Sequence, residues 1–470
     1  MMLAQWWHKA FLERRPSISL GLFRLAVAWT VGCHMIPSFF HMEDNYLSTA
    51  FKTKNYWFFP VWIIRLVERS PDGVVWTFVG LFCLSLAAFT VGLYAQLSCI
   101  LMTLACYYFY ALNHYHIGTL SFDILLVTLF LMCVTNFHGD FLSLDSLRRG
   151  KIGTYKRLRP FGIQRLLQLQ LAWTFWGTAL SKITAGGNWL TGNPYYHLMR
   201  YPPIGVVRDF PLREWLGAHP ALCYGLGLVL LSFELTVPVL WFIPPPAGAA
   251  EGGRSQRDHS PMANPAGGGI IPRFRSIARP LAIALGIAFQ VMLWATLHVP
   301  TIFLFLFPAM MLLFIPPESL VERIEQHQQT NAERGRAILL YDGRCGFCLE
   351  SVRRLRILDL FGWVDPLDFH TQPDLAKLSP VLTPERCRSE MILLEPNGRL
   401  SGGFQAFARM TLRLPLLMGL APLVHLPGAD WVGTRAYRWI AAHRYLLHRN
   451  STCQTNQCVL PAGKSEPSNN

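Results

Sequence analysis

Long apolar runs dominate the first two thirds of the chain, and they predict helices that span a membrane. A helix needs about 20 apolar residues to cross the hydrocarbon core, and Trp- and Tyr-rich joints flank several of the runs, as interfacial belts do. A shorter apolar stretch at 55–67 is expected to lie in the interface or to re-enter it. We expect eight spans, at 18–37, 73–92, 93–112, 117–136, 166–184, 221–243, 280–298 and 301–316.

The Lys and Arg residues between these spans predict the orientation. Counted with the N-terminus inside, the inner segments hold 15 basic residues and the outer segments hold 7. This bias favours a multi-pass protein of the cell (inner) membrane with both termini cytoplasmic. The stretch at 280–316 has one central break, at Pro300, and can cross the membrane once or twice. If this stretch crosses once rather than twice, the C-terminal domain lies outside.

The pattern changes near residue 337, where short strands and amphipathic helices replace the apolar runs. We expect a strand at 337–341, a helix at 346–361, an edge strand at 363–369, a hairpin through 396–398, and helices near 402–413 and 430–446. Pro366 makes the second strand an edge strand, because proline cannot donate to a central ladder. This order is typical of a small thioredoxin-like α/β domain.

The predicted fold class is therefore a multi-pass α-helical membrane domain of about eight spans plus a small C-terminal α/β thioredoxin-like domain. The expected boundaries are 1–316 for the membrane domain, 317–336 for a linker, 337–450 for the α/β domain and 451–470 for a polar tail.

Composition agrees with an integral membrane protein whose first partner is the lipid bilayer. The chain of 470 residues is 52% hydrophobic and 15% charged, whereas soluble domains carry about 25% charged residues. The net charge of +14 does not indicate nucleic acid as a partner. Many of the basic residues sit in short loops between apolar spans rather than on one soluble face.

Only four of the eleven cysteines are paired in sequence, and these are Cys345 with Cys348 and Cys453 with Cys458. The chain is therefore not a disulfide framework. Six others are scattered singly on apolar segments, where cysteine acts as a small hydrophobe. These six are Cys33, Cys83, Cys99, Cys106, Cys133 and Cys223.

The first pair lies where a redox dithiol is expected, between a strand with a tight turn and the start of a helix. The helix N-terminus offers unpaired N–H groups and partial positive charge, which favour the thiolate of Cys345. Cys348, one turn further on, can resolve a mixed disulfide. Two alternatives remain open: a zinc site completed by Cys453 and Cys458, and inert structural thiols.

The stretch "YDGRCGFCLESVRRLRILD" resembles the opening of the DCC family of thiol-disulfide oxidoreductases, which has an Asp-Gly-x-Cys-x-x-Cys motif. The likeness continues through "GFQAFARMTLRLP" and "YRWIAAHRYLLHR" and covers roughly 337–450. It implies that Asp342, Cys345 and Cys348 are the motif residues. It also implies a thiol/disulfide protein or a small thiol as the redox partner. Thioredoxins place a cis-proline before the strand that faces the CxxC motif, but here "RS" precedes "EMILL".

Ionisable residues within the apolar spans are candidate functional groups, because they are costly to bury in lipid. Two alternatives compete: Lys182 reaches toward the interface, or it acts as a base in an apolar pocket. His114 and His116 are expected on the same side of the membrane as Lys182, and they can also be plain interfacial residues. Arg24, Asp123 and Glu234 are expected to be internal pairs or helix contacts, and His298 is a further ionisable residue within a span.

The stretches "ALNHYHIGT" and "WGTALSKITAGGNWLTGN" resemble the HTTM (horizontally transferred transmembrane) domain, which is related to vitamin K-dependent gamma-carboxylase. The resemblance covers roughly 15–316. It implies a base at Lys182 that deprotonates the hydroquinone form of a quinone-like lipid such as vitamin K, with Asn113-His114 nearby. The large extra-membrane region of the carboxylase is missing from this chain, and where the family often has Phe-His the chain has Phe289-Gln290.

The sequence thus predicts a membrane-bound thiol-disulfide oxidoreductase in which Cys345 attacks and Cys348 resolves. A quinone-like lipid is the one cofactor considered, and no metal site is predicted. One alternative is a gamma-carboxylase-like enzyme with an auxiliary redox domain. The other is a non-catalytic membrane scaffold with a zinc-bound C-terminal domain.

Overall fold

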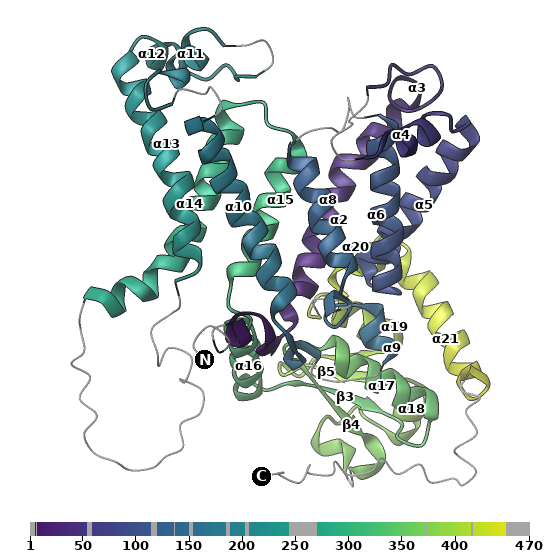
Figure 1. Ribbon diagram of the computed structural model, residues 1–470. Coiled ribbons are helices and arrows are strands. Elements are labelled where there is room, and N and C mark those ends of the chain that lie inside the picture. The colour runs from purple at the N-terminus through teal and green to yellow at the C-terminus, as the bar shows by residue number, and fades with distance from the viewer. Residues whose placement is uncertain are drawn as a thin grey trace. The chain divides into compact units, whose positions relative to one another are not determined.

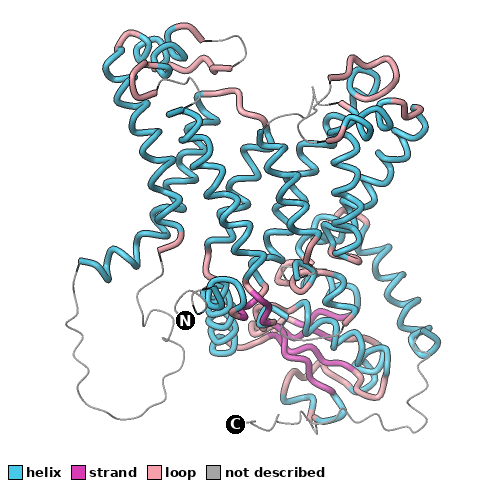
Figure 2. Tube along the Cα trace, viewed as in Figure 1, coloured by secondary structure: helices cyan, strands magenta, loops and turns pink. Residues whose placement is uncertain are grey.

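The computed structural model divides the chain into two compact units, which are shown in Figures 1 and 2. The helical unit comprises Met1–Asp145 and Tyr155–Leu320, and the α/β unit comprises Ser146–Thr154 and Val321–Asn470. The structure describes residues 5, 7–53, 59–113, 120–135, 137–149, 154–184, 189–202, 206–243, 270–372, 374–414 and 417–447. The expected polar tail at 451–470 lies outside this range.

The helical unit contains long helices joined by short turns and short helices (Figure 1). Its long helices are α2 (Ile18–Ser38), α5 (Asp72–Val91), α6 (Ala95–Leu112), α8 (Leu120–Cys133), α10 (Gly162–Thr184), α13 (Pro220–Trp241), α14 (Ile270–Thr296) and α15 (Thr301–Met311). Its short elements are η1 (His8–Leu12), β1 (Arg14–Pro16), η2 (Phe39–His41), α3 (Met42–Asn45), α4 (Val61–Glu68), η3 (Phe137–Gly139), α9 (Leu144–Arg148, which continues into the α/β unit), η4 (Thr154–Lys156), β2 (Leu158–Pro160), α11 (Pro194–Arg200), α12 (Arg213–Gly217) and η5 (Leu312–Phe314).

Several of these helices are long and apolar enough to cross a membrane. Within the described part of the chain there are five, or up to six if the bent pair Ile302–Phe314 and Pro317–Arg334 is one span. The five are Ile18–Asn45, Asp72–Val91, Ala95–Leu112, Pro220–Trp241 and Ile277–Thr296. Each of the eight expected spans coincides with a helix, but the number eight is not confirmed. The expected interfacial stretch at 55–67 contains the short helix α4.

Helix α10 illustrates why the number of membrane spans does not follow from apolarity alone. It carries glutamines on several turns, and these bind the backbone of neighbouring elements. Gln164 and Gln168 each donate from Nε2 to the carbonyl of Leu313 at 2.7 Å, and Gln170 donates to the carbonyl of Ile124 at 2.8 Å. These bonds join α10 to η5 and α8, and such interhelical bonds are a usual source of stability between apolar helices.

Arg24 on α2 has a structural position, in agreement with the expectation that it makes internal contacts. Its side chain is buried, and it donates to the carbonyls of Phe89 at 2.6 Å and Thr90 at 3.0 Å. It also donates to the carbonyl of Leu142. Gly92 allows this approach, because a Cβ on Gly92 would lie 2.5 Å from Nη1 of Arg24.

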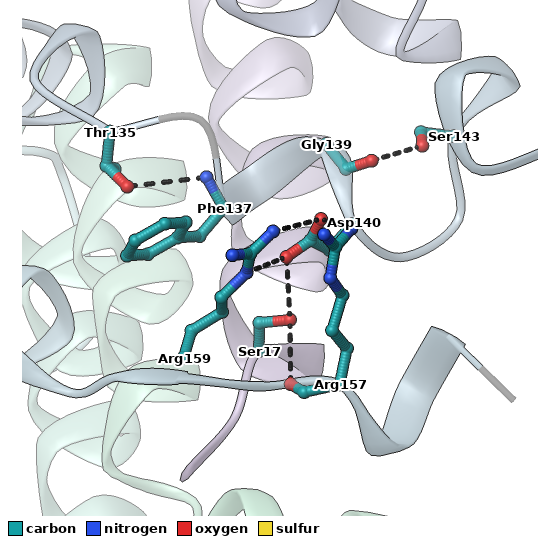
Figure 3. A network of polar contacts seen from close by, with 8 residues as sticks. All are labelled: Ser17, Thr135, Phe137, Gly139, Asp140, Ser143, Arg157 and Arg159. Atoms are coloured by element: carbon teal, nitrogen blue, oxygen red, sulfur yellow. Dashed lines mark hydrogen bonds and ion pairs between the residues drawn. The ribbon is translucent and has the colours of Figure 1, made fainter. Parts of the chain in front are cut away.

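Asp140 joins three separate parts of the helical unit, as Figure 3 shows. Its buried carboxylate accepts hydrogen bonds from Arg157 at 2.6 Å and Arg159 at 2.7 Å, and from the hydroxyl of Ser17 at 3.4 Å. Arg159 belongs to β2, which pairs antiparallel with β1, and Ser17 immediately precedes α2. One carboxylate therefore holds the loop after α8 against β2 and the start of α2.

The α/β unit has a four-stranded sheet of order β4-β3-β5-β6. Strands β3 (Ala337–Tyr341) and β4 (Val364–Asp368) are parallel, β3 and β5 (Ile392–Leu394) are antiparallel, and β6 (Leu400–Gly402) forms a hairpin with β5. The expected strand, edge strand and hairpin are all confirmed. The remaining elements are α16 (Pro317–Arg334), which occupies the expected linker, α17 (Gly346–Leu358), η6 (Phe369–Thr371), η7 (Leu375–Lys377), α18 (Pro384–Ser389), α19 (Gly403–Thr411), η8 (Met418–Leu420), α20 (Ala421–Val424) and α21 (Ala429–Leu447).

The alternation of side chains along β3 gives the sheet two apolar faces. Leu339 and Tyr341 pack in the same cluster as Cys345 and Cys348 on one face. Leu340 packs on the other face in a cluster that contains Cys387 from α18. Successive side chains of a strand point to opposite faces, so β3 carries the core of the unit on both sides and ends at the cysteine motif.

We predict that Asp140→Asn lowers the free energy of unfolding by about 1–3 kcal/mol, because two arginines lose a charged acceptor at a buried position. The change is measured as the denaturant dependence of unfolding in detergent micelles. Asp209→Asn is the matched control, because Asp209 is 94% exposed in its pair with Arg213. Equal effects of the two substitutions would show that the Asp140 network does not stabilise the unit.

Candidate active site

Strand β3, a three-residue turn and helix α17 position the two cysteines. Cys345 is the N-cap residue of α17, and its Sγ accepts a hydrogen bond from the backbone N–H of Cys348 at 3.3 Å. The N–H of Cys345 donates to the carbonyl of Asp342 at 3.2 Å, which closes the turn. A capping sulfur at a helix N-terminus accepts from a backbone donor and lies at the positive end of the helix dipole. Both effects favour the thiolate of Cys345.

The carboxylates of Asp342 and Asp368 hold the turn between β3 and α17. Oδ1 of Asp342 accepts from the N–H of Arg344 at 3.0 Å and lies 3.0 Å from Nε2 of His370. Oδ1 of Asp368, at the end of β4, accepts from the N–H groups of Gly343 at 3.0 Å and His370 at 3.1 Å. Because β3 and β4 are parallel, their carboxyl ends meet, and Asp368 reaches the turn after β3.

A small cavity of about 40 Å³ lies beside Cys348. Two acidic residues contribute to its wall, and helix α21 contributes three side chains. The lining residues are Asp342, Phe347, Cys348, Cys387, Glu390, Met391, Tyr437, Ile440 and Ala441. Cys345 is 1% exposed and Cys348 is 4% exposed, so the dithiol is enclosed in this conformation.

Cys387 is a third thiol at the wall of the same cavity. It lies on α18 in the apolar cluster beneath the sheet. Burial raises the pKa of the Cys387 thiol, which keeps this sulfur protonated near neutral pH. A protonated thiol is a poor nucleophile, which disfavours Cys387 as an attacking group.

The strand that faces the cysteines is closed by hydrogen bonds at the point where thioredoxins have their cis-proline. The N–H of Met391 donates to the hydroxyl of Tyr437 at 3.0 Å, and the carbonyl of Met391 accepts from Gly403 at 3.0 Å. The described residues contain no cis peptide bond. Helix α21 thus binds the backbone donor of Met391, and β5 itself is paired with β3 on one side and β6 on the other.

Neither zinc ligands nor another metal cluster is brought together in the part of the chain that the structure describes. No group of three or more His, Cys, Asp or Glu residues there has the geometry to hold a metal ion. Cys453 and Cys458, which the zinc alternative requires, lie outside the described residues.

In the helical unit, Lys182 faces a second and larger cavity of about 340 Å³. Its ammonium forms an ion pair with Glu234 of α13 and lies 5.2 Å from the ring centroid of Trp189. Among the described residues that line the cavity, Lys182 and Glu234 are the charged ones, and most of the others are apolar. The apolar lining includes Phe175, Leu230, Phe289, Met292, Leu293, Phe303 and Phe307.

The other membrane-site candidates are not gathered at this cavity by the described structure. The Nδ2 of Asn113 donates to the carbonyls of Asn45 at 2.6 Å and Phe51 at 3.1 Å, and its Oδ1 accepts from Thr53 at 3.2 Å. Asn113 thus ties the end of α6 to the loop after α3 and does not line the cavity. His114 and His116 lie outside the described residues.

Sequence reasoning did not include His370, Asp368 or Tyr437 in the site. The position of Asp368 could have been predicted from the sequence, since Asp368 ends the strand that was expected to pair beside the motif strand. Tyr437 carries no local signal, because its contact with Met391 joins positions 46 residues apart. Glu234 was noted only as an internal pair or helix contact, and the structure makes it the partner of Lys182.

We predict that Tyr437→Phe raises the alkylation rate of the dithiol about 2- to 12-fold in the reduced full-length protein. The lost hydrogen bond is worth about 0.5–1.5 kcal/mol, and its loss shifts the equilibrium toward an open α21 by that factor. Mass spectrometry of the Cys345 peptide measures the rate. Trp439→Phe on the exposed side of the same helix is the control, and an equal rate in both variants would contradict the role of Tyr437.

Comparison with known proteins gives one match, and it covers the α/β unit. Residues 339–450 match the family model of the DCC1-like thiol-disulfide oxidoreductases. No curated protein and no solved structure matches the chain. The match includes the last three residues of β3, the turn, helix α17 and helix α21. The chain thus has several apolar helices that are consistent with a membrane protein, and its residues 339–450 form a DCC1-like thiol-disulfide oxidoreductase domain.

Proposed function

We propose that the protein is an integral membrane thiol-disulfide oxidoreductase whose reaction is carried by Cys345 and Cys348. The observation that carries this proposal is the bond from the N–H of Cys348 to the sulfur of Cys345 at the start of α17. It supports a thiolate at the first cysteine and keeps the second within one helical turn. The family match over 339–450 supports the same chemistry.

The exchange proceeds in two displacements. The thiolate of Cys345 attacks one sulfur of a substrate disulfide, forms a mixed disulfide and releases the other substrate sulfur as a thiolate. The thiolate of Cys348 then attacks the Cys345 sulfur and releases the second substrate thiolate. Two thiols of the protein become one disulfide, and the substrate disulfide becomes two thiols once each thiolate has taken up a proton. The reverse sequence oxidises a substrate dithiol.

In this proposal, Asp342 accepts the proton of Cys348 during the second displacement. Both residues line the 40 Å³ cavity, which has room for a water molecule. Proton transfer through one water is compatible with general-base catalysis. His370, 3.0 Å from the same carboxylate, orients Asp342 toward this position.

The enclosed site favours a small thiol or a short, flexible segment of a protein as the partner. Strand β5 is already paired with β3 and β6, and the N–H of Met391 before it is bound by Tyr437, so a substrate can reach this donor only if α21 moves. The positive-inside pattern of the sequence supports termini in the cytoplasm, where glutathione and protein thiols are the available redox partners. A bacterial-type inner membrane is the proposed location.

Substitution of the two cysteines distinguishes their roles. In the purified full-length protein, Cys345→Ser is expected to abolish reduction of a model protein disulfide. Cys348→Ser is expected to accumulate a mixed disulfide on Cys345, because the resolving thiol is missing. Cys83→Ser is the control, since this exposed thiol belongs to α5 of the helical unit. Full activity of Cys345→Ser would refute the proposal.

A second candidate function concerns the cavity of the helical unit. Its size, its apolar wall and its single Lys182–Glu234 ion pair suit a quinone-like lipid, with a polar head at the ion pair and a ring or tail along the aromatic residues. The resemblance of this part of the sequence to the HTTM domain supports the same ligand class. A membrane quinone would then exchange two electrons with the dithiol of Cys345 and Cys348.

We predict that Lys182→Met weakens binding of a short-chain quinone about 10- to 150-fold, because a hydrogen bond to a charged group contributes about 1.5–3 kcal/mol. Equilibrium dialysis measures binding, and Lys156→Met at η4 is the control. Quinone-dependent oxidation of Cys345 that is unchanged in Lys182→Met would exclude the coupling. Incorporation of CO2 that depends on a reduced quinone would instead favour the carboxylase-like alternative.

A further inference from the structure

A second pair of thiols meets inside the helical unit, although its members are far apart in the sequence. Sγ of Cys99 on α6 and Sγ of Cys133, the last residue of α8, are 3.8 Å apart. A disulfide has a sulfur–sulfur distance of about 2.05 Å. A movement of under about 2 Å would therefore join the two sulfurs.

The pair packs in the apolar core of the helical unit, but it is also joined to polar side chains there. The thiol of Cys133 donates to Oγ1 of Thr103 at 3.3 Å, and Oγ1 of Thr103 donates to the carbonyl of Cys99 at 2.7 Å. The Nε2 of Gln96 donates to the carbonyl of Cys133. Gln96, Cys99 and Thr103 lie three and four residues apart, and this spacing puts them on one face of α6.

The two cysteines differ in access and lie near the end of the helices. Cys99 is fully buried, whereas Cys133 is only partly buried and is followed by Val134, which is 65% exposed. Cys99 lies in the second turn of α6, close to Ala95, whose N–H is capped by Asp145 at 2.8 Å. A reagent that enters from the end of the bundle therefore reaches Cys133 first.

We propose that Cys99 and Cys133 form a second redox-active dithiol, which a low-molecular-weight disulfide such as oxidised glutathione converts reversibly to a disulfide between α6 and α8. The thiolate of Cys133 attacks the small disulfide and releases one small thiolate. The thiolate of Cys99 then attacks the Cys133 sulfur and releases the second. Two protein thiols are oxidised and one small disulfide is reduced, and the two protons go to the released thiolates.

Such a dithiol gives the helical unit a redox state of its own. The disulfide closes a loop from residue 99 to residue 133 and locks α6 to the end of α8, so the unit is more constrained in the oxidised form. This role is independent of the chemistry at Cys345 and Cys348. It holds whether or not the α/β unit performs thiol-disulfide exchange.

The test uses the full-length protein with Cys345→Ser and Cys348→Ser, which removes the first dithiol from the reaction. The protein is equilibrated with mixtures of reduced and oxidised glutathione, quenched with acid, alkylated and digested, and the linked 99–133 peptide is quantified. We expect the linked peptide to appear as the share of oxidised glutathione rises and to disappear again when reduced glutathione is restored. Its appearance is also expected to raise the unfolding temperature in detergent.

Control variants distinguish a redox-active pair from two cysteines that are only packed together. Cys99→Ser and Cys133→Ser are each expected to abolish the linked peptide, and Cys133→Ser is expected to abolish glutathionylation in this region. Cys33→Ser, on α2, is expected to leave the peptide unchanged. Absence of the linked peptide at every glutathione ratio, or a link from Cys133 to Cys106 instead, would show that Cys99 and Cys133 are packed neighbours only.

Discussion

The backbone N–H of Cys348 donates to the sulfur of Cys345, and the organisation of the α/β unit depends on this contact. The bond forms only where a helix begins at the first cysteine, so the chain must leave β3 and enter α17 within three residues. The two carboxylates of Asp342 and Asp368 hold that turn. Gly343 is required there, because a Cβ would lie 2.0 Å from Oδ2 of Asp368. The capping hydrogen bond and the two carboxylates that hold the turn therefore stabilise the same local conformation.

Enclosure of the dithiol follows from the packing of α21. This helix covers the side of Cys348 and binds the N–H of Met391 through Tyr437. An enclosed thiolate is protected from unspecific oxidation, but it can exchange only when its cover opens. In the proposed reaction, access and reactivity therefore depend on different elements: α17 carries the attacking sulfur, and α21 covers it.

The sequence predicts those features whose signals are local. Strand β3, the turn and α17 follow from adjacent residues, and Pro366 correctly identifies β4 as an edge strand. Contacts over long sequence distances are not predicted: Tyr437 with Met391, His370 with Asp342, and Cys99 with Cys133 all depend on tertiary packing. Apolarity locates the membrane helices but does not count the spans, since the glutamines of α10 are satisfied by neighbouring backbone.

The most direct test of the central claim is a redox titration of Cys345 and Cys348 in the full-length protein. The fraction of disulfide is measured by mass spectrometry across defined ratios of reduced and oxidised dithiol buffer. A catalytic pair predicts a reversible two-electron transition with a midpoint between about −120 and −270 mV. A midpoint below about −300 mV would indicate a structural disulfide. Failure to form the disulfide at any potential would contradict the assignment of the pair as a redox centre.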